Sequence, residues 1–455
     1  MAPPALRTPP PAVPVPPPAE EPEAKRPWYN PRTFAAFDFE PFRWYMGAMI
    51  WWNAAMSMQM LVRGYLAFNL TDDFRSLGIV GLGSAIPMLI LSPFGGVIAD
   101  RTSKRLVLQL GQSFSILIAV VMAALLFAGV LEFWHLFAAS VAQGLMMALV
   151  MPSRQAFLPE VVGLGRLMNA IPLQTAGMNL MQIMAPTLGG FMIDWIGGGS
   201  VYSVMAVMYA MSVIMLFKVE SMTPEEQEAA RAGAVGRAGK GGRGRGRPGA
   251  SDGRRPGTLA ELKGGFAYIF RDRTVLGILS FAFLGSLLGM PIRMLLPGYV
   301  AEVFGDSGST LGLLQMGMGI GALGGALVLA TLRMDQHRGL LLAGSSVVMG
   351  VAMLGFSSTG VFIVGWFGLL VIGIGSAGRQ ALSQVLVQEY VEDEYRGRVM
   401  ALFMMQFSLM SVGTFFVSLY MQQVGPEFAI GSLGAVLIAA TVIYLALVPR
   451  FRRLA

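Results

Sequence analysis

Asp100 stands at the end of an apolar segment and is followed at once by a basic cluster, Arg101, Lys104 and Arg105. A carboxylate can bind the positive N-terminal end of a helix, a contact that stabilises by about 0.3 to 1 kcal/mol when exposed and up to ~2 kcal/mol when partly buried. An energy of this size can favour one of two conformations of a protein without abolishing the other. A cluster that only sets membrane topology is the alternative, but it leaves Asp100 without a role.

Polar residues also fall inside the apolar segments, where they could line a path for a solute. A charged side chain inside a membrane helix costs at least a few kcal/mol, so each arginine there needs water, a partner or a substrate anion. Snorkelling of the arginines to the outer headgroups stays an open alternative. We expect a substrate pathway formed by Asn53, Gln59, Arg63, Asn179, Gln182 and Arg293.

The fifth apolar segment carries Pro186, Gly189 and Gly190 within about 100° of Asn179 and Gln182 when the residues are placed on a helix. Small residues let neighbouring helices approach closely, and proline permits a kink. We therefore expect a kink or close packing here, with the two amides facing a cavity.

The residues needed for other chemistry are missing. Cysteine is absent, and the two histidines, His135 and His337, fall near expected helix ends, so we expect no metal site. No nucleotide-binding loop and no nucleophile with its base emerges, so we expect neither an enzyme nor a cofactor. No acid stands near the middle of an apolar segment, and Asp194 lies close to an outer end, which leaves proton coupling open.

The composition shows which elements position these residues. The chain has 455 residues, is 55% hydrophobic and only 13% charged, so it must lie in lipid. Lipid cannot satisfy exposed backbone groups, and continuous runs rich in Leu, Met, Ala and Gly indicate helices, not a barrel of short alternating strands. We expect an all-α membrane protein with twelve spans, approximately 43–68, 76–98, 106–130, 134–156, 168–193, 200–219, 272–298, 309–331, 339–357, 361–386, 398–422 and 429–448.

The polar segments divide the chain further. We expect a disordered Pro-rich tail at 1–41, a first six-helix bundle at 42–220, a Gly/Arg-rich linker at 221–263, a second bundle at 264–449 and a basic tail at 450–455. The linker could contact RNA or anionic headgroups. A solvated cytoplasmic tether is the simpler interpretation, and we expect no nucleic-acid partner.

The basic residues of the loops are distributed asymmetrically. One side carries the linker and Arg101, Lys104, Arg105, Arg154, Arg166, Arg333, Arg338, Arg379, Arg396, Arg398, Arg450, Arg452 and Arg453. The other side carries only Arg75 among several acids. Because basic loops stay in the cytoplasm, we expect both termini and the linker there.

Short sequence repeats, here called echoes, relate the two halves of the chain. Arg63-Gly64-Tyr65 and Leu77-Gly78 return at one fixed offset as Pro297-Gly298-Tyr299 and Leu311-Gly312. Ser153-Arg154-Gln155-Ala156 likewise returns as Gly378-Arg379-Gln380-Ala381. Internal duplication is typical of transporters that rock about a central site, so we expect two pseudo-symmetric bundles.

The segment from Gly96 to Arg105 resembles the loop between the second and third helices of major facilitator superfamily transporters, with Ser103 in place of the usual glycine. The resemblance covers 42–453, and the segments 151–160, 169–170 and 395–399 are similar to the branch that contains enterobactin exporters and related efflux permeases. It implies a conformational latch in which Asp100 binds the start of the eleventh helix. The latch residues would be Gly96, Asp100, Arg101, Arg105, Arg154 and Arg398.

We therefore expect a monomeric permease of the inner or plasma membrane that exports a small amphipathic organic molecule, such as a drug-like compound, metabolite or siderophore, by alternating access. An uptake permease for a sugar or organic acid is the second hypothesis. A transport-inactive scaffold or sensor is a third, from another class.

Overall fold

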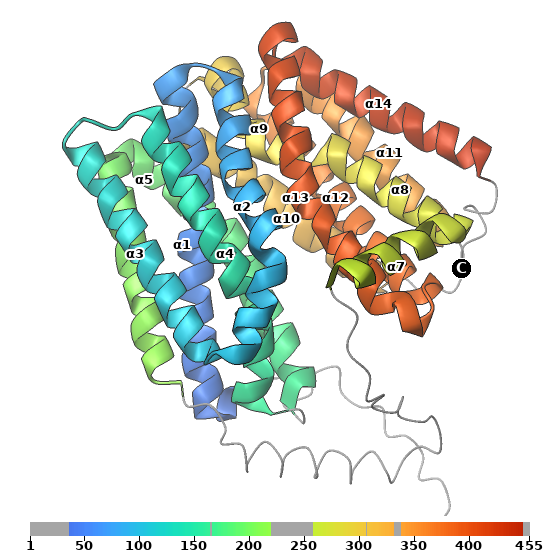
Figure 1. Ribbon diagram of the computed structural model, residues 1–455. Helices are drawn as coiled ribbons and strands as arrows, with labels where there is room; N and C mark the ends of the chain where they lie inside the picture. The colour runs from blue at the N-terminus through green and yellow to red at the C-terminus, as the bar shows by residue number, and fades with distance from the viewer. Residues whose placement is uncertain (1–35, 164–165, 220–257, 306, 332–337, 449–455) are drawn as a thin grey trace, which may run out of the picture.

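The computed structural model describes residues 36–163, 166–219, 258–305, 307–331 and 338–448, and these residues form helices without a single strand. Apolar side chains face lipid and neighbouring helices, while each helix satisfies its own backbone hydrogen bonds. The helices form two groups that lie side by side, one from each half of the chain (Figure 1). They approach each other at the top of the view and diverge toward the bottom.

The first group contains α1 (Glu40–Thr71), α2 (Phe74–Arg101), α3 (Lys104–Phe127), α4 (Phe133–Val162) and α5 (Leu167–Phe217). The 51 residues of α5 would extend about 75 Å as one helix, more than twice the ~30 Å hydrocarbon core of a bilayer. Gly197 divides it, with φ 75° and ψ 161°, a conformation that glycine adopts without steric cost. Thus α5 provides both the fifth and the sixth span.

The second group begins with α7 (Thr258–Arg271), a short helix ahead of the membrane part. The seventh span is built in three pieces: α8 (Arg273–Gly289), α9 (Pro291–Tyr299) and the π-helical η3 (Val300–Phe304). The remaining spans are α10 (Gly308–Thr331), α11 (Arg338–Ser357), α12 (Phe362–Tyr390), α13 (Asp393–Val424) and α14 (Pro426–Leu447).

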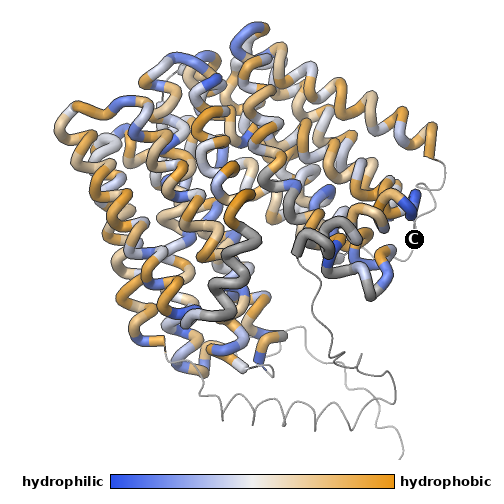
Figure 2. The backbone as a smooth tube through the Cα atoms, in the orientation of Figure 1, coloured by the Kyte–Doolittle hydropathy of each residue, from blue (hydrophilic) through white to orange (hydrophobic). Residues whose placement is uncertain are grey.

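The length and polarity of the helices support twelve spans. Among the described residues, nine helical segments are long and apolar enough to cross a membrane, and one of them, Asn169–Phe217, is the double segment. The other two spans are α1 and α13, each of 32 residues and more polar than the remaining long helices. Hydrophobic residues, orange in Figure 2, predominate along the helices, and hydrophilic residues, blue, lie mainly near the helix ends.

Echoed glycines lie where the two groups cross. A β-carbon on Gly78 of α2 would come within 2.9 Å of the Phe415 Cα in α13. One on Gly312 of α10, the echo of Gly78, would come within 2.9 Å of the Thr187 carbonyl oxygen in α5. Only glycine allows backbones to approach this closely, so the internal echo marks contacts between the halves.

The predicted tails and linker lie largely outside the described residues. The structure begins its description at residue 36, and α1 starts at Glu40, inside the range expected for the tail. Similarly, α7 starts at Thr258, inside the range 221–263 expected for the linker. The division into 42–220 and 264–449 remains a prediction.

A candidate transport cavity between the two halves

A cavity of about 220 Å³ lies between the two groups of helices. It is lined by α1, α2 and α4 from the first half and by α9, α10 and α13 from the second. Its polar lining comprises Ser57, Gln59, Arg63, Ser84, Gln143, Arg293, Gln315 and Ser411. No described residue of the lining is an aspartate or a glutamate. The cavity therefore combines positive charge with neutral hydrogen-bonding groups.

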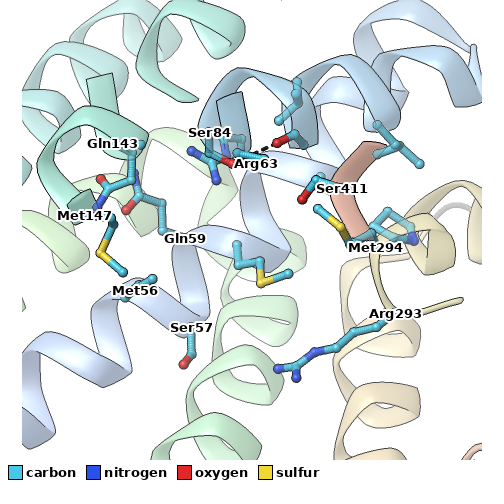
Figure 3. A pocket seen from close by; sticks show the side chains of 18 of the residues that line it. Met56, Ser57, Gln59, Arg63, Ser84, Gln143, Met147, Arg293, Met294 and Ser411 are labelled. Carbon is cyan, nitrogen blue, oxygen red and sulfur yellow. Dashed lines mark hydrogen bonds between the residues drawn. The ribbon is translucent and has the colours of Figure 1, made fainter. Parts of the chain in front are cut away.

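The apolar part of the lining is rich in thioethers, from Met56, Met60, Met88, Met147 and Met294. Methionine is unbranched and polarizable, so it adapts its shape to irregular apolar surfaces. Figure 3 shows Met56 and Met147 beside Gln59 and Gln143 on one side of the cavity, with Met294 on the other. The site can thus contact both the polar and the apolar parts of one solute.

Arg63 and Gln59 lie one turn apart on α1 and both reach the cavity. The Tyr209 hydroxyl donates a hydrogen bond of 2.7 Å to Gln59 Oε1, which fixes the amide. Gln59 Nε2, Arg63 Nη1 and Gln143 Oε1 are buried without a hydrogen-bond partner in the described structure. A buried polar group in that condition costs about 1 to 3 kcal/mol, so these atoms favour a polar ligand.

Arg293 reaches the same cavity from the other half. The seventh span breaks at Met290, and Pro291 begins α9, so Arg293 lies in the first turn of a new helix. This helix packs closely on α1, because a β-carbon on Gly64 would lie only 3.1 Å from Pro297 Cγ. Broken helices at the interface of two repeats are where transporters bind their solutes.

A second cavity, of about 350 Å³, lies between α4 and α5. Arg154, predicted for the latch, lines it together with Asn179 and Gln182, which were predicted for the substrate pathway. The Arg154 guanidinium lies over the Trp52 ring, 5.2 Å from its centroid, a favourable cation–π geometry. The two amides predicted for the pathway thus line this cavity and not the one between the halves.

Asn53 has a different position from the other predicted pathway residues. It is buried, and its Nδ2 donates a 2.9 Å hydrogen bond to the carbonyl oxygen of Met178 in α5. It is absent from the lining of both cavities described above. In this structure, Asn53 joins α1 to α5.

The predicted latch is only partly described. Gly96, Asp100 and Arg101 lie outside the residues whose side chains the structure describes. Arg105 donates a hydrogen bond to the Phe217 carbonyl oxygen at the end of α5. The Arg398 guanidinium lies 5.5 Å from the centroid of the Tyr395 ring.

The loop after α2 accounts for the serine that departs from the family pattern. Ser103 is the N-cap of α3, and its hydroxyl accepts a hydrogen bond from Leu106 N at 3.4 Å. Serine is a favoured residue at this position. The next residue, Lys104, forms an ion pair with Glu160 of α4.

The small residues of the fifth span lie at helix crossings. A β-carbon on Gly190 would lie 2.2 Å from the Gly308 carbonyl oxygen in α10, and one on Gly189 would lie 2.6 Å from Met58 Cγ in α1. The described α5 backbone is helical through Pro186 and is interrupted at Gly197. Gly190 therefore sets how closely the two halves approach.

Comparison with known proteins identifies the family of the chain. The sequence model described as the Major Facilitator Superfamily matches residues 43–414. The chain belongs to the major facilitator superfamily. The all-α architecture with twelve spans in the described residues and the membership were both expected from the sequence, and both are confirmed.

Curated relatives of this major facilitator chain include a protein named as a transporter and one named as an exporter. The chain is 22% identical over 375 residues to the staphyloferrin A transporter of Staphylococcus aureus (strain NCTC 8325 / PS 47), which covers 81% of this chain and 86% of that protein. It is 25% identical over 340 residues to the enterobactin exporter EntS of Citrobacter koseri, which covers 72% of each.

Solved structures share the fold at low identity. A peptide transporter POT in complex with alafosfalin has a TM-score of 0.68 at 14% identity, over 90% of this chain and 94% of that one. A D-xylose-proton symporter has a TM-score of 0.64 at 15% identity, over 92% and 99%. The protein is a multi-pass membrane transporter of the major facilitator type.

Two contacts between the halves of this transporter were not foreseen from the sequence. Asp194 of α5 caps the start of α10: its Oδ1 accepts from Gly308 N at 2.8 Å, and its Oδ2 accepts from Ser309 N at 2.8 Å. Gln422 of α13 accepts from Phe74 N at the start of α2, at 2.7 Å. Each contact joins one half to the N-terminus of a helix in the other.

No local sequence pattern predicts these contacts, because their partners are distant along the chain. Asp194 and Gly308 are 114 residues apart, and the only signal was an isolated acid near the end of a span.

Arg379, counted in the sequence as a loop residue, is instead buried in α12. Its Nη1 donates to Ser286 Oγ at 3.0 Å and to the carbonyl oxygen of Ala282 at 3.1 Å.

Proposed function

We propose that this chain is a secondary transporter that exports a small amphipathic organic molecule by alternating access of its two halves. The observation that carries the proposal is the cavity between the halves, with polar groups and methionines from both sides. A solute bound there contacts both groups of helices, so its binding energy depends on how they are arranged. That dependence is what a transporter requires.

Contacts at one end of the cavity support the alternating part of the proposal. Asp194 and Gln422 hold the halves together at the end that the charge distribution predicts to be outside. The described structure then corresponds to the state closed to the outside. Release to the outside requires both contacts to break, and the Asp100 latch would hold the opposite state.

The relatives support a siderophore-like substrate and outward direction. One is named for staphyloferrin A transport and another for enterobactin export, and both match more than two thirds of the chain. We further propose that the transporter works as a monomer in the cell membrane, with both termini in the cytoplasm. No described residue lining the cavity is an acid, so we infer that any proton coupling does not rest on a carboxylate there.

Inverted membrane vesicles test the function directly. Vesicles that contain the chain are given iron-free staphyloferrin A, enterobactin, ethidium or D-xylose, with and without an imposed pH gradient. We expect accumulation of one of the first two above that of empty vesicles. Uptake of D-xylose by whole cells, with no accumulation in inverted vesicles, would instead support the uptake hypothesis.

The pH gradient separates coupling from transport. Accumulation that needs the gradient supports proton exchange, whereas equal transport without it excludes that mechanism. Absence of transport for every compound, with normal abundance and insertion, would favour a transport-inactive scaffold.

A further inference from the structure

We propose that the solute taken by the cavity between the halves is an organic anion, and that Arg63 and Arg293 bind its negative group. The inference rests on the proposed transport function and names the substrate class of the same site. It depends on the charge, the unpaired polar atoms and the position of the cavity.

The charge of the lining is unbalanced. Two guanidinium groups reach one cavity of about 220 Å³, and no described lining residue carries a carboxylate. Within the described residues, the ion pairs are Arg75–Asp73, Lys104–Glu160 and Arg338–Glu389, and none involves either cavity arginine. Like charges removed from water repel each other and lose hydration, and an anion between the halves offsets both effects.

The unsatisfied hydrogen-bonding atoms of the lining residues are of the kinds that an oxyanion with a hydroxyl group would satisfy. Arg63 Nη1 and Gln59 Nε2 are donors without partners, and Gln59 is 3% exposed. A guanidinium presents parallel N–H groups that match the two oxygens of a carboxylate. Gln143 Oε1, an acceptor without a partner, could receive a hydroxyl of the same solute. The methionines would contact its apolar body.

The burial of one Arg63 nitrogen argues against simple snorkelling of that side chain. Arg63 Nη1 is buried, so this nitrogen does not reach water or the headgroups. Figure 3 shows Arg63 beside Ser84 on one side, while Arg293 extends from α9 on the other. Because one arginine belongs to each half, an anion that contacts both would couple its binding to their approach.

A matched series of small probes tests the inference. 4-Phenylbutyrate, 4-phenylbutyramide and 4-phenylbutylamine have nearly the same shape but are negative, neutral and positive. Their binding to the full chain in phosphatidylcholine nanodiscs is measured by calorimetry, and their transport is measured in proteoliposomes. We expect the carboxylate to bind at least tenfold more tightly than the amide or the amine, as hydrogen bonds to charged groups imply.

The variants Arg63→Gln and Arg293→Gln should each weaken binding of the carboxylate about tenfold to a hundredfold, with little effect on the amide. Arg63→Lys and Arg293→Lys should retain part of the preference for the carboxylate over the amide, because lysine keeps the positive charge but lacks the paired N–H donors of the guanidinium. Arg75→Gln is the matched control, since Arg75 is exposed, pairs with Asp73 and lies outside the cavity. Size-exclusion profiles confirm that each variant is folded.

Equal binding of amide and carboxylate, or a carboxylate preference that survives in the double Gln variant, would overturn the anion site. Repeating the measurement with phosphatidylglycerol distinguishes a lipid headgroup as the source of the anion. We expect no change, and a carboxylate affinity that falls as this lipid is added would refute a solute site. If the carboxylate binds through the arginines but neither the probes nor any of the vesicle substrates is transported, the anion site stands and the proposed transport function fails.

Discussion

Replacing Asp194 with Asn should open the predicted outer end of the transporter. The Asp194 carboxylate accepts hydrogen bonds from Gly308 N, Ser309 N and the Ser307 hydroxyl, at 2.8, 2.8 and 3.0 Å. It thereby caps α10 and places a negative charge at that helix's positive end. The amide keeps one acceptor oxygen but loses the charge and the second acceptor.

The size of the effect follows from these losses. A helix cap contributes about 1 kcal/mol, and a charge at a helix terminus contributes about 0.3 to 1 kcal/mol. Asp194 is exposed, so solvent screens the charge, and one oxygen remains. We therefore expect about 1 kcal/mol less stabilisation of the outer-closed state, which changes the ratio of closed to open molecules about fivefold.

Spin labels can measure that ratio, because the chain contains no cysteine that must first be removed. The substitutions Val130→Cys and Ser358→Cys place labels on exposed loops of the two halves at the predicted outer end. Asp194→Asn should increase the population with the longer distance between labels. Glu132→Gln is the control, because Glu132 caps its own helix, α4, and touches no residue across the interface in the described contacts.

An unchanged distance distribution in folded Asp194→Asn would refute the closing role. The same shift in Glu132→Gln would also refute it, since loss of any outer carboxylate would then suffice.

Other perturbations test the same arrangement. Gln422→Met removes the acceptor for Phe74 N, so it should destabilise the outer-closed state by up to about 1 kcal/mol and increase the population with the longer distance between labels. An unchanged population would mean that this contact does not stabilise closure. Gly190→Ala should increase the population with the longer distance more than Gly189→Ala does. The new β-carbon at 190 would lie 2.2 Å from the Gly308 backbone oxygen, whereas the nearest atom to a β-carbon at 189 belongs to the flexible Met58 side chain, at 2.6 Å. Equal effects of the two variants would contradict the close backbone crossing at Gly190. Asp100→Asn should act in the opposite direction and make the predicted cytoplasmic side more accessible to single-cysteine labelling, so unchanged labelling on both sides would refute the latch. Deleting residues 231–255 should leave transport in vesicles unchanged if the linker is a tether, and a large loss with normal insertion would favour recruitment of a partner.

The sequence by itself determined the class of the protein and the positions of its spans. Continuous apolar runs of membrane length permit only helices in lipid, so the spans follow from composition and length. The motif around Asp100 indicated the family, and the echoed glycines indicated two related halves. Gly78 and Gly312 then proved to lie at crossings between those halves, because close approach of backbones selects glycine in both copies.

Tertiary structure decided which polar residues share a cavity. Gln59, Arg63 and Arg293 were expected in the pathway and do line one cavity, whereas Asn53 bonds to α5, and Asn179 and Gln182 line another cavity with Arg154. Periodicity predicts the face of a helix on which a residue lies, but not which neighbour that face meets. Asp194 and Gln422 bind helix starts far away along the chain, so no local pattern could have identified their partners.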